Sequence, residues 1–581
     1  MSRNFRKKTF QAEIASRRPL QKASVLVIAL SIILAALVPR LIYFSHMKAN
    51  PYYDGTAETS IIGLDQRNFI ERAKRILDEG LIGRGAFPQA PLYDYYMALV
   101  FKLFGPSVPA MRLVQLFMGA FACGLIFWIG REVYGTRTGV IAGLLAAFYP
   151  VSIYYDWILL RSAFAAQINL LLLMVLLLAC RTRNKLWWLA GGFFLGLSCL
   201  VQANAIVFTP FLLAWIWFGC RGEPAAQRCK MMVLLLVGLG LIGALLAGRN
   251  LAAGAPLLHV DSQGPFVFYV GNAADALGNG YKIPPSYADV PHDHLVASAL
   301  RSAWQNPGDY LKLTGRKIAA FFNGFETPNN MSFYLFQEYS WVLRNPLLSF
   351  ALLSPLGILG MLLSLRRSTQ SMLIAFFVIA GSLSVILFYI LSRFRYPLTY
   401  FFIILSAYAV SWFWDHLKLR EFKKAGLIGA LFIPLAAATA TRPFTYGFIS
   451  PHDLYNTGLA YSKINQDGHA LECFQRALKI DARFEPAQSS IYFLAGKRLV
   501  RENRYGEAAA AFKEALGLMP GDTGARDNYL IAVSTYLVQQ HRYAEAAEAI
   551  RQIVDQYPGN DTAKKNLAYC LHMLGDVNKK Q

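Results

Sequence analysis

Long apolar stretches constrain this chain more than any other feature of its sequence. They recur from Ala23 onward in blocks of about 20 residues, the length that crosses the hydrocarbon core of a bilayer as a helix. Hydrophobic residues make up 55% of the 581 residues and charged residues only 16%, too few to cover a soluble protein of this size. The sequence therefore predicts an all-α polytopic membrane protein.

Hydropathy predicts about eleven spans, give or take two, because neighbouring apolar runs merge or split easily. The aromatic segment "PLYDYYMALVFKLFG" is expected to lie at the membrane interface instead. The predicted spans are 23–44, 111–130, 138–153, 160–180, 186–201, 205–220, 231–247, 347–365, 371–391, 396–414 and 425–440.

Basic clusters between the spans set the predicted orientation. They occur in the N-terminal segment 1–22, at "RTRNK", at "RGEPAAQRCK", at "RR" and at "KLREFKK", and with eleven spans all of them fall on one side. By the positive-inside rule, that side is predicted to be cytoplasmic. The first apolar run has no small-residue cleavage site, so we interpret it as a signal anchor that is retained. A net charge of +22 then reflects cytoplasmic loops, and we expect no nucleic-acid partner.

The predicted transmembrane domain spans residues 23–448 and sends two loops to the non-cytoplasmic side, 45–90 and 249–344.

Seven cysteines are scattered along the chain without a CxxC pair, so neither a disulfide framework nor a zinc site is indicated. We expect no cofactor, although the pair His292 and His294 leaves a divalent metal open.

The tail, 449–581, is charged and internally repetitive. Three similar segments follow one another: "HALECFQRALKIDARFEPA", "YGEAAAAFKEALGLMPGDTGA" and "YAEAAEAIRQIVDQYPGNDTA". Each has a large apolar residue after closely packed alanines and a proline expected to end its helix (Pro486, Pro520, Pro558), and the last two align 38 residues apart. The spacing is slightly longer than the ~34 residues of a tetratricopeptide repeat. We expect an α-solenoid of about three to four repeats on the non-cytoplasmic side, serving either peptide binding or stability and oligomerisation.

An acid, Asp65, opens "GLDQRNFIERAK" in the first loop. Phe69, Ala73, Ile76 and Leu77 share one face of a helix expected to begin at Gln66 and end at Gly80. By local rules Asp65 is an N-cap, worth roughly 1 kcal/mol. Capping and chemistry at the bilayer surface do not exclude one another.

Several motifs in order along the chain resemble one family of enzymes. They are "PLY" and "MRLVQLFMGAFACGLIFWIG" after the first-loop acid, then "FVFYVGNAADALGNGY", "FFNGFETPNN" and "SRFRYPLTYFFIILSAYA". The chain resembles bacterial membrane glycosyltransferases of the protein-mannosyltransferase and aminoarabinose-transferase class, which have the GT-C fold. Some of these also carry C-terminal tetratricopeptide repeats. Where some relatives have Asp-Glu in the first loop, this chain has Asp65-Gln66, so Asp54 in "YYDGT" also remains a candidate.

The resemblance implies a chemistry. A loop carboxylate, Asp65 or Asp54, takes the proton of an acceptor hydroxyl as it attacks the anomeric carbon, with inversion. Arg393 and Arg395 in "SRFRYP" would bind the phosphate that leaves, because a guanidinium meets phosphate oxygens through paired hydrogen bonds. Arginines at the end of a span also commonly reach toward lipid headgroups.

Four further residues are candidates for substrate contacts. Glu326 lies in "NGFETPNN", Tyr93 in the "PLY" segment and Asn272 in a glycine-rich stretch that is otherwise typical of a turn. Asp156 in "YYDWILLRSAFA" either completes the pocket or pairs with Arg161. For each, a solvated or purely structural role is the alternative.

The function we expect is transfer of a sugar from a polyprenyl-phosphate donor to a protein, glycan or lipid hydroxyl, at the periplasmic face of a bacterial inner membrane. The repeats favour a protein acceptor or partner. A cell-envelope oligosaccharide ligase or polymerase also joins many spans to repeats, but typically places its active loop late in the chain. A lipid-linked sugar transporter is disfavoured because the apolar runs are nearly free of charge.

Overall fold

The computed structural model describes residues 22–61, 64–182, 184–278, 282–329, 331–345, 347–365, 367–441 and 448–580. The predicted cytoplasmic segment 1–22 lies outside these residues except for Lys22, as do Arg366 and Asn330 of the motifs above. The described residues form α-helices and short 3-10 helices, and no β-strand occurs among them. An all-α fold is therefore confirmed.

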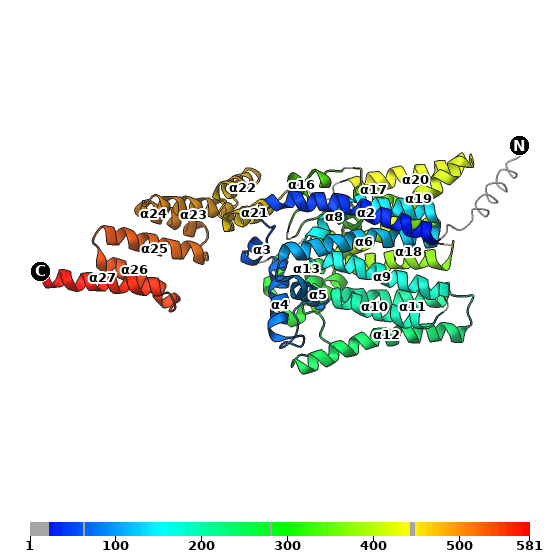
Figure 1. Cartoon of the computed structure of the whole chain (residues 1–581), viewed down its shortest axis with the longest axis horizontal. Coiled ribbons are helices and arrows are strands. Elements are labelled where there is room, and N and C mark those ends of the chain that lie inside the picture. The colour runs from blue at the N-terminus through cyan, green and yellow to red at the C-terminus, as the bar shows by residue number, and fades with distance from the viewer. Residues whose placement is uncertain are drawn as a thin grey trace. The chain divides into compact units, whose positions relative to one another are not determined.

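The chain divides into two compact units, which we describe separately. The first comprises the residues up to 55 together with 62–445, and the second comprises 56–61 together with 446–581. In the first unit the long helices run side by side in a bundle (Figure 1).

The first half of unit 1 contains α2 (Lys22–His46), η1 (Met47–Ala49), α4 (Asp65–Glu79), α5 (Leu92–Phe104), α6 (Val108–Tyr134), α7 (Thr136–Phe148), α8 (Pro150–Trp157), α9 (Arg161–Thr182), α10 (Leu186–Val201), η2 (Ala203–Val207), α11 (Phe208–Gly219) and α12 (Ala225–Ala252). The second half contains α13 (Gly264–Asn272), η3 (Pro285–Asp289), η4 (His292–His294), α14 (Leu295–Gln305), α15 (Pro307–Phe322), α16 (Phe333–Tyr339), η5 (Trp341–Leu343), α17 (Phe350–Ser364), α18 (Thr369–Ile386), α19 (Ser392–Lys418) and α20 (Phe422–Ala440).

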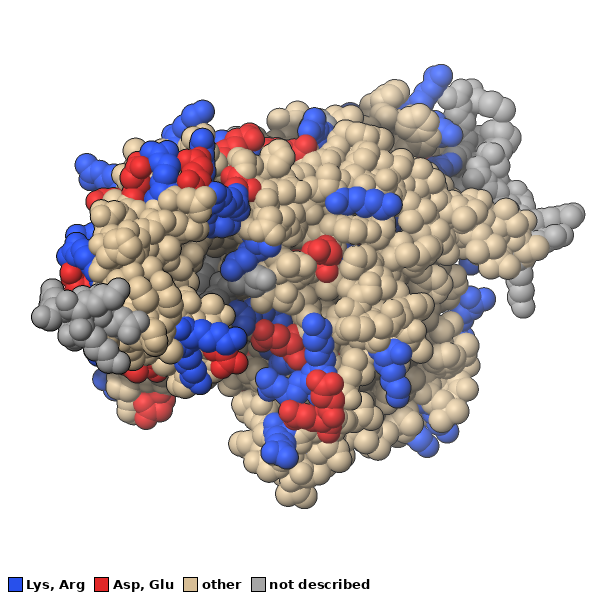
Figure 2. Space-filling model, turned by 60° about the vertical axis from the view of Figure 1, so that its left-hand side comes forward, with Lys and Arg blue, Asp and Glu red and all other residues tan. Residues whose placement is uncertain are grey.

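Seven described helices are long and apolar enough to cross a membrane: α2, α6, α9, α12, α18, α19 and α20. The bent pair α7 and α8 adds one more if it forms a single span. The remaining predicted spans coincide with the shorter apolar helices, which are α10, η2 with α11, and α17. Every predicted span thus lies on a helix, while the count of eleven stays a prediction. Figure 2 shows a broad area with few charged side chains on the face drawn, as expected of a surface that meets lipid.

Glycines let neighbouring spans approach closely. A Cβ at Gly192 of α10 would overlap the backbone of α12, and one at Gly360 of α17 would overlap the backbone of α19. Lipid supplies no hydrophobic force between helices, so membrane bundles gain packing by bringing backbones together at small residues.

The first-loop helix is α4, and it corrects two details of the prediction. It begins at Asp65, so Leu64 occupies the N-cap position and Asp65 is the first helical residue. Of the four residues expected to share one face of the helix, Phe69, Ala73 and Ile76 are buried, whereas Leu77 is exposed. Gly80 ends the helix as predicted, with a φ of 88° and its N–H bonded to the carbonyl of Ile76.

Unit 2 is a helical solenoid made of pairs of antiparallel helices (Figure 1). Its elements are the short α3 (Thr56–Ser60), which packs on α21, and then α21 (Pro451–Lys463), α22 (Asp467–Ile480), α23 (Glu485–Arg501), α24 (Tyr505–Leu518), α25 (Thr523–Gln539), α26 (Tyr543–Gln556) and α27 (Asp561–Lys580). Three helix pairs are followed by α27, which covers the last of them.

Backbone geometry repeats with the period read from the sequence. Asn465, Asn503 and His541 stand 38 residues apart, and each adopts a φ near 60° in the turn inside its helix pair. The first helices of the second and third pairs have 17 residues each. The excess over the ~34-residue period corresponds to about one helical turn. Pro520 and Pro558 follow helix ends, but Pro486 lies in the first turn of α23 rather than ending α22.

Candidate active site

Asp65 and Arg393 form an ion pair although 328 residues separate them in the sequence. Asp65 opens α4 and Arg393 lies in the first turn of α19, so the pair joins the first loop to the start of a late span. Both side chains keep partial access to solvent, with exposed fractions of 22% and 18%. The partial positive charge at the N-terminus of α4 stabilises the carboxylate of Asp65. The same effect at the N-terminus of α19 destabilises the positive charge of Arg393, and the Asp65 carboxylate compensates for this.

Two cavities share Arg393, the cation of this ion pair. The first, of about 320 Å³, is lined by Tyr155, Glu326, Ser392 and Arg393 among others. The second, of about 280 Å³, is lined by Asp65, Arg393 and Arg161, with Gln89 and Gln202. Leu160 and Arg393 belong to both linings. A ligand phosphate in either cavity therefore has a guanidinium within reach, next to a carboxylate.

Arg395, the second arginine of the motif, lies in a different environment. Its side chain is buried, and Nη1 donates to the carbonyls of Phe321 and Asn323 at 3.1 and 2.5 Å. Nη2 forms an ion pair with Glu326 at 2.9 Å, and the guanidinium stacks on Phe350 at 4.0 Å. With its donors occupied by the protein, Arg395 is suited to fixing the "NGFE" segment against α19 rather than to receiving a phosphate.

Glu326 links that buried arginine to the first cavity. Its side chain is buried beside Arg395 and also lines the 320 Å³ cavity. Its backbone N–H donates to the hydroxyl of Tyr334 at 2.9 Å, and the Tyr334 ring stacks on Phe325. The carboxylate is therefore held in a defined place on the wall of the cavity.

Asp54, the alternative base, is exposed in the turn before α3. The turn itself is held firmly, because Arg112 donates to the carbonyls of Tyr52 and Tyr53 at 2.5 and 2.6 Å. The Arg112 guanidinium also stacks over Trp157 at 3.7 Å. Asp54 does not line either cavity at the Asp65–Arg393 pair.

Asp156 pairs with Arg40 and not with Arg161, and it lines neither cavity, so neither alternative that the sequence left open for it describes its contacts. The Arg40–Asp156 ion pair measures 2.9 Å, and both side chains are fully buried. A Cβ at Gly119 would overlap the carboxylate, which shows how closely α6 covers it. Arg161 instead pairs with Asp261 at 3.3 Å. The missed signal is a charged residue inside the first apolar run, since a cation within a span needs a buried partner.

Tyr93 and Asn272 are buried and lie outside both cavity linings. The Tyr93 hydroxyl donates to Gln115 at 2.7 Å. Asn272 donates to the carbonyls of Phe268 and Leu387 and accepts from Lys317 at 2.8 Å. Lys317 is itself buried, and this desolvation lowers its pKa to about 8. These contacts tie the long loop to the end of α18, which is a structural task.

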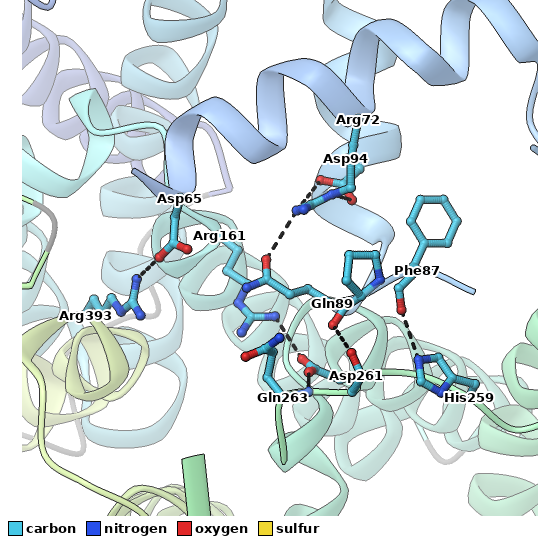
Figure 3. A network of polar contacts seen from close by, with 12 residues as sticks. Asp65, Arg72, Phe87, Gln89, Asp94, Arg161, His259, Asp261, Gln263 and Arg393 are labelled. Atoms are coloured by element: carbon cyan, nitrogen blue, oxygen red, sulfur yellow. Dashed lines mark hydrogen bonds and ion pairs between the residues drawn. The ribbon is translucent and has the colours of Figure 1, made fainter. Parts of the chain in front are cut away.

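A polar network surrounds the Asp65 end of α4 (Figure 3). Arg72, further along the same helix, donates to Asp94 at 2.7 Å and to Gln89 at 3.2 Å. Burial raises the pKa of Asp94 to about 6 even though the Arg72 charge opposes that shift. Sequence reasoning missed Gln89 and Asp94 and considered Arg161 only as a partner of Asp156, because nothing in their spacing marks residues that meet only after folding.

Among the described residues, no group of three or more histidines, cysteines, aspartates or glutamates is placed to hold a metal ion. His292 and His294 lie exposed on η4, and His294 approaches only Asp293, at 3.7 Å. The described residues thus present no ready-made metal centre.

Comparison with known protein families gives one match in each part of the chain. Residues 88–246 match the family model of dolichyl-phosphate-mannose-protein mannosyltransferases. Residues 455–523 and 534–579 match tetratricopeptide repeats. No curated protein matches the chain significantly by sequence.

Solved structures give similarities over much of the chain. The archaeal oligosaccharyltransferase AglB from Archaeoglobus fulgidus, solved with an inhibitory peptide and a dolichol-phosphate, is 16% identical with a TM-score of 0.41; the match covers 80% of this chain and 59% of that one. ArnT from Cupriavidus metallidurans bound to undecaprenyl phosphate is 13% identical with a TM-score of 0.40, and the match covers 92% and 81%.

This chain thus spans less than two thirds of the length of the archaeal enzyme. The family match begins just before "PLY", extends into α12 and contains two of the five motifs, "PLY" and "MRLVQLFMGAFACGLIFWIG". The resemblance to GT-C glycosyltransferases with C-terminal tetratricopeptide repeats, indicated by the sequence motifs, is confirmed.

Proposed function

We propose that this protein is an inverting glycosyltransferase that moves a sugar from a polyprenyl-phosphate donor to an acceptor hydroxyl at the periplasmic face of a bacterial inner membrane. One observation carries the proposal: an acid and an arginine from distant segments form an ion pair, and the arginine lines two cavities, one of which the acid also lines. The match of residues 88–246 to mannosyltransferases supports the class of reaction.

The ion pair suggests how donor binding prepares the base. A donor phosphate that enters beside Arg393 competes with the Asp65 carboxylate for the guanidinium, and a phosphate is the better bidentate partner. Exchange of partners leaves Asp65 free to accept a proton. The carboxylate is thus kept charged and in place until the donor arrives.

In the transfer itself, the acceptor oxygen attacks the anomeric carbon and its proton passes to Asp65. The bond from that carbon to the phosphate oxygen breaks, and the lipid phosphate leaves with the bonding electrons, stabilised by Arg393. Attack opposite to the leaving group inverts the configuration, so one base suffices. No second carboxylate is needed in this scheme.

The other predicted residues receive more limited roles. Arg395 is a positioning residue that holds Glu326 and its loop on the cavity wall, and Glu326 is the residue best placed there to contact the sugar or acceptor. Asp54 stays the alternative base. Asp156, Tyr93 and Asn272 serve the fold, as their burial and contacts indicate.

The tetratricopeptide repeats extend the proposal to a protein acceptor or partner. Solenoids of this kind usually bind peptides on their concave face. A repeat domain on the acceptor side of the membrane suits delivery of a polypeptide hydroxyl. The sugar and the acceptor sequence are left to experiment.

Substitution of the acids tests the proposal. A deletion strain is complemented with the wild type, Asp65→Asn, Asp54→Asn or Asp78→Asn, and envelope proteins and glycans are compared by mass spectrometry. Asp78 is an exposed acid on the same helix and serves as the matched control. Loss of the base is expected to reduce transfer by about 10²–10⁴-fold in the Asp65 variant alone.

Immunoblots must show equal amounts of each variant in the membrane. A full loss in Asp54→Asn with activity kept in Asp65→Asn would move the base to Asp54. Wild-type transfer by both variants would rule out a carboxylate base from the first loop.

A further inference from the structure

A third pocket, lined by basic residues, lies toward the opposite end of α4 from Asp65. It has a volume of about 410 Å³ and is formed by the last turns of α4, the loop 80–88 and the last turn of α12. Four arginines line it, Arg72, Arg75, Arg84 and Arg249, against one acid, Glu79. Ten residues of helix, or about 15 Å, separate Arg75 from Asp65, so this pocket is distinct from the candidate active site.

Two of the arginines are held by the protein. Arg72 is committed to Asp94 and Gln89. Arg249 donates to the carbonyl of Gly85 at 2.8 Å and stacks over the Phe87 ring at 4.2 Å. Its Nε is nonetheless buried with no hydrogen-bond partner among the described residues. Arg249 is therefore a cation that the protein holds in place in the wall of the pocket.

The other two arginines are available to a ligand. Arg75 and Arg84 are exposed, and neither forms an ion pair with a residue in the described ranges. Charges that line one pocket repel one another unless an anion lies between them. Two exposed guanidiniums beside one that the protein holds in place make a suitable set of donors for phosphate oxygens.

The loop that carries Arg84 is built to hold its shape. Gly80, Gly83 and Gly85 all have positive φ values, which other residues adopt only with strain. Gly85 N–H donates to the carbonyl of Ala253 at 2.7 Å, and His259 approaches the carbonyl of Phe87 at 3.0 Å. The loop is thus clipped to the end of α12 and to the segment after it.

Exposed apolar side chains occur in the pocket lining and on the chain that continues from Arg249. Leu81, which lines the pocket, is 72% exposed, while Leu251 in the last turn of α12 and Leu258 in the segment after it are 73% and 74% exposed. Since α12 is a candidate span, its last turn lies where a helix leaves the hydrocarbon. Leucines beside arginines at that depth are typical of a segment that rests in the headgroup layer.

We propose that this pocket binds the phosphate of an anionic phospholipid headgroup. The arginines supply the charge complement, and the exposed leucines contact the acyl chains, a combination that free phosphate does not use. Binding there anchors the C-terminal end of α4 to the bilayer while Asp65 at its other end remains free to act. This inference does not depend on the proposed glycosyl transfer.

The test uses the full-length protein purified in a neutral detergent. Short-chain phosphatidylglycerol, short-chain phosphatidylcholine and inorganic phosphate are titrated separately, and the midpoint of thermal unfolding reports binding. For the wild type, phosphatidylglycerol is expected to raise the midpoint at lower concentration than either other probe. The double variant Arg75→Gln/Arg84→Gln is expected to bind phosphatidylglycerol roughly thirtyfold more weakly.

The matched control is Arg67→Gln/Lys74→Gln, which removes two positive charges from the same helix outside the pocket lining. It should bind like the wild type. Each single variant, Arg75→Gln or Arg84→Gln, should weaken binding about fivefold, which preserves the test if the double variant does not fold. Equal weakening in control and pocket variants, or equal binding of inorganic phosphate and the lipid, would overturn the proposal.

Discussion

Two ion pairs in unit 1 look alike in the sequence and differ in what surrounds them. Asp65–Arg393 and Asp156–Arg40 each join an acid near a helix end to an arginine of a distant span. The first is about one-fifth exposed and opens on two cavities, while the second is fully buried under α6. A pair that a ligand can reach can exchange partners; a sealed pair can only hold helices together.

The same contrast separates Arg393 from Arg395, two residues apart on α19. One faces a carboxylate in a cavity, and the other is enclosed by backbone carbonyls and Glu326. On a helix, residues two apart point about 200° away from each other, which is why neighbours in a motif serve different tasks.

The largest effect is expected at the sealed pair. Arg40→Met leaves the Asp156 carboxylate buried without its cation, and should cost about 3–5 kcal/mol of stability. Thermal unfolding of the purified protein measures this loss. The double variant Arg40→Met/Asp156→Leu should recover most of it, because no charge then remains buried. Failure to recover would mean that the pair does more than compensate charge.

Arg393 and Arg395 should respond differently to the same change. Arg393→Gln removes a charged contact to the donor phosphate, worth about 1.5–3 kcal/mol, and should raise the donor KM roughly ten- to a hundredfold with little change in Tm. Arg395→Gln should instead lower Tm, since it leaves Glu326 and several carbonyls poorly satisfied. Donor titrations and thermal unfolding of both variants separate the two roles. Equal effects on KM and Tm would erase the distinction.

The Arg72–Asp94 pair is intermediate in burial between the two ion pairs compared above. We expect the smallest of the three effects here, a dependence of stability on pH. Burial raises the pKa of Asp94 to about 6, whereas an unfolded chain has an Asp pKa of about 3.9. The folded state therefore holds its proton more tightly, and stability falls as pH rises through that window, by about 2 kcal/mol.

Asp94→Asn lacks this titration and provides the control. Its Tm relative to the wild type should be highest at pH 7 and should decrease on acidification to pH 5. A difference in Tm that stays constant across this range would show that Asp94 keeps an ordinary pKa in the folded protein.

The repeat domain shows how much of an architecture can be predicted from sequence periodicity alone. Their spacing of 38 residues appears in the sequence, and it reappears in the positive φ of Asn465, Asn503 and His541. In a solenoid each repeat contacts only its neighbours, so the architecture depends on residues that are close in the sequence. Even so, Pro486 was assigned to the wrong helix end, because a proline suits both the end of one helix and the first turn of the next.

By itself the sequence determined the all-α membrane architecture, the placement of the spans on helices, the repeat domain and the resemblance to glycosyltransferases, because apolar length and period are local properties of a chain. It also singled out Asp65 and Arg393 separately. Only the tertiary structure decided that these two residues form an ion pair and that Arg395 is buried among backbone carbonyls. It also decided that Asp156 pairs with Arg40 rather than with Arg161, which is nearer in the sequence. Partner choice among charges depends on which helix ends the packed bundle brings together and how much water remains there, and no local pattern encodes that distance.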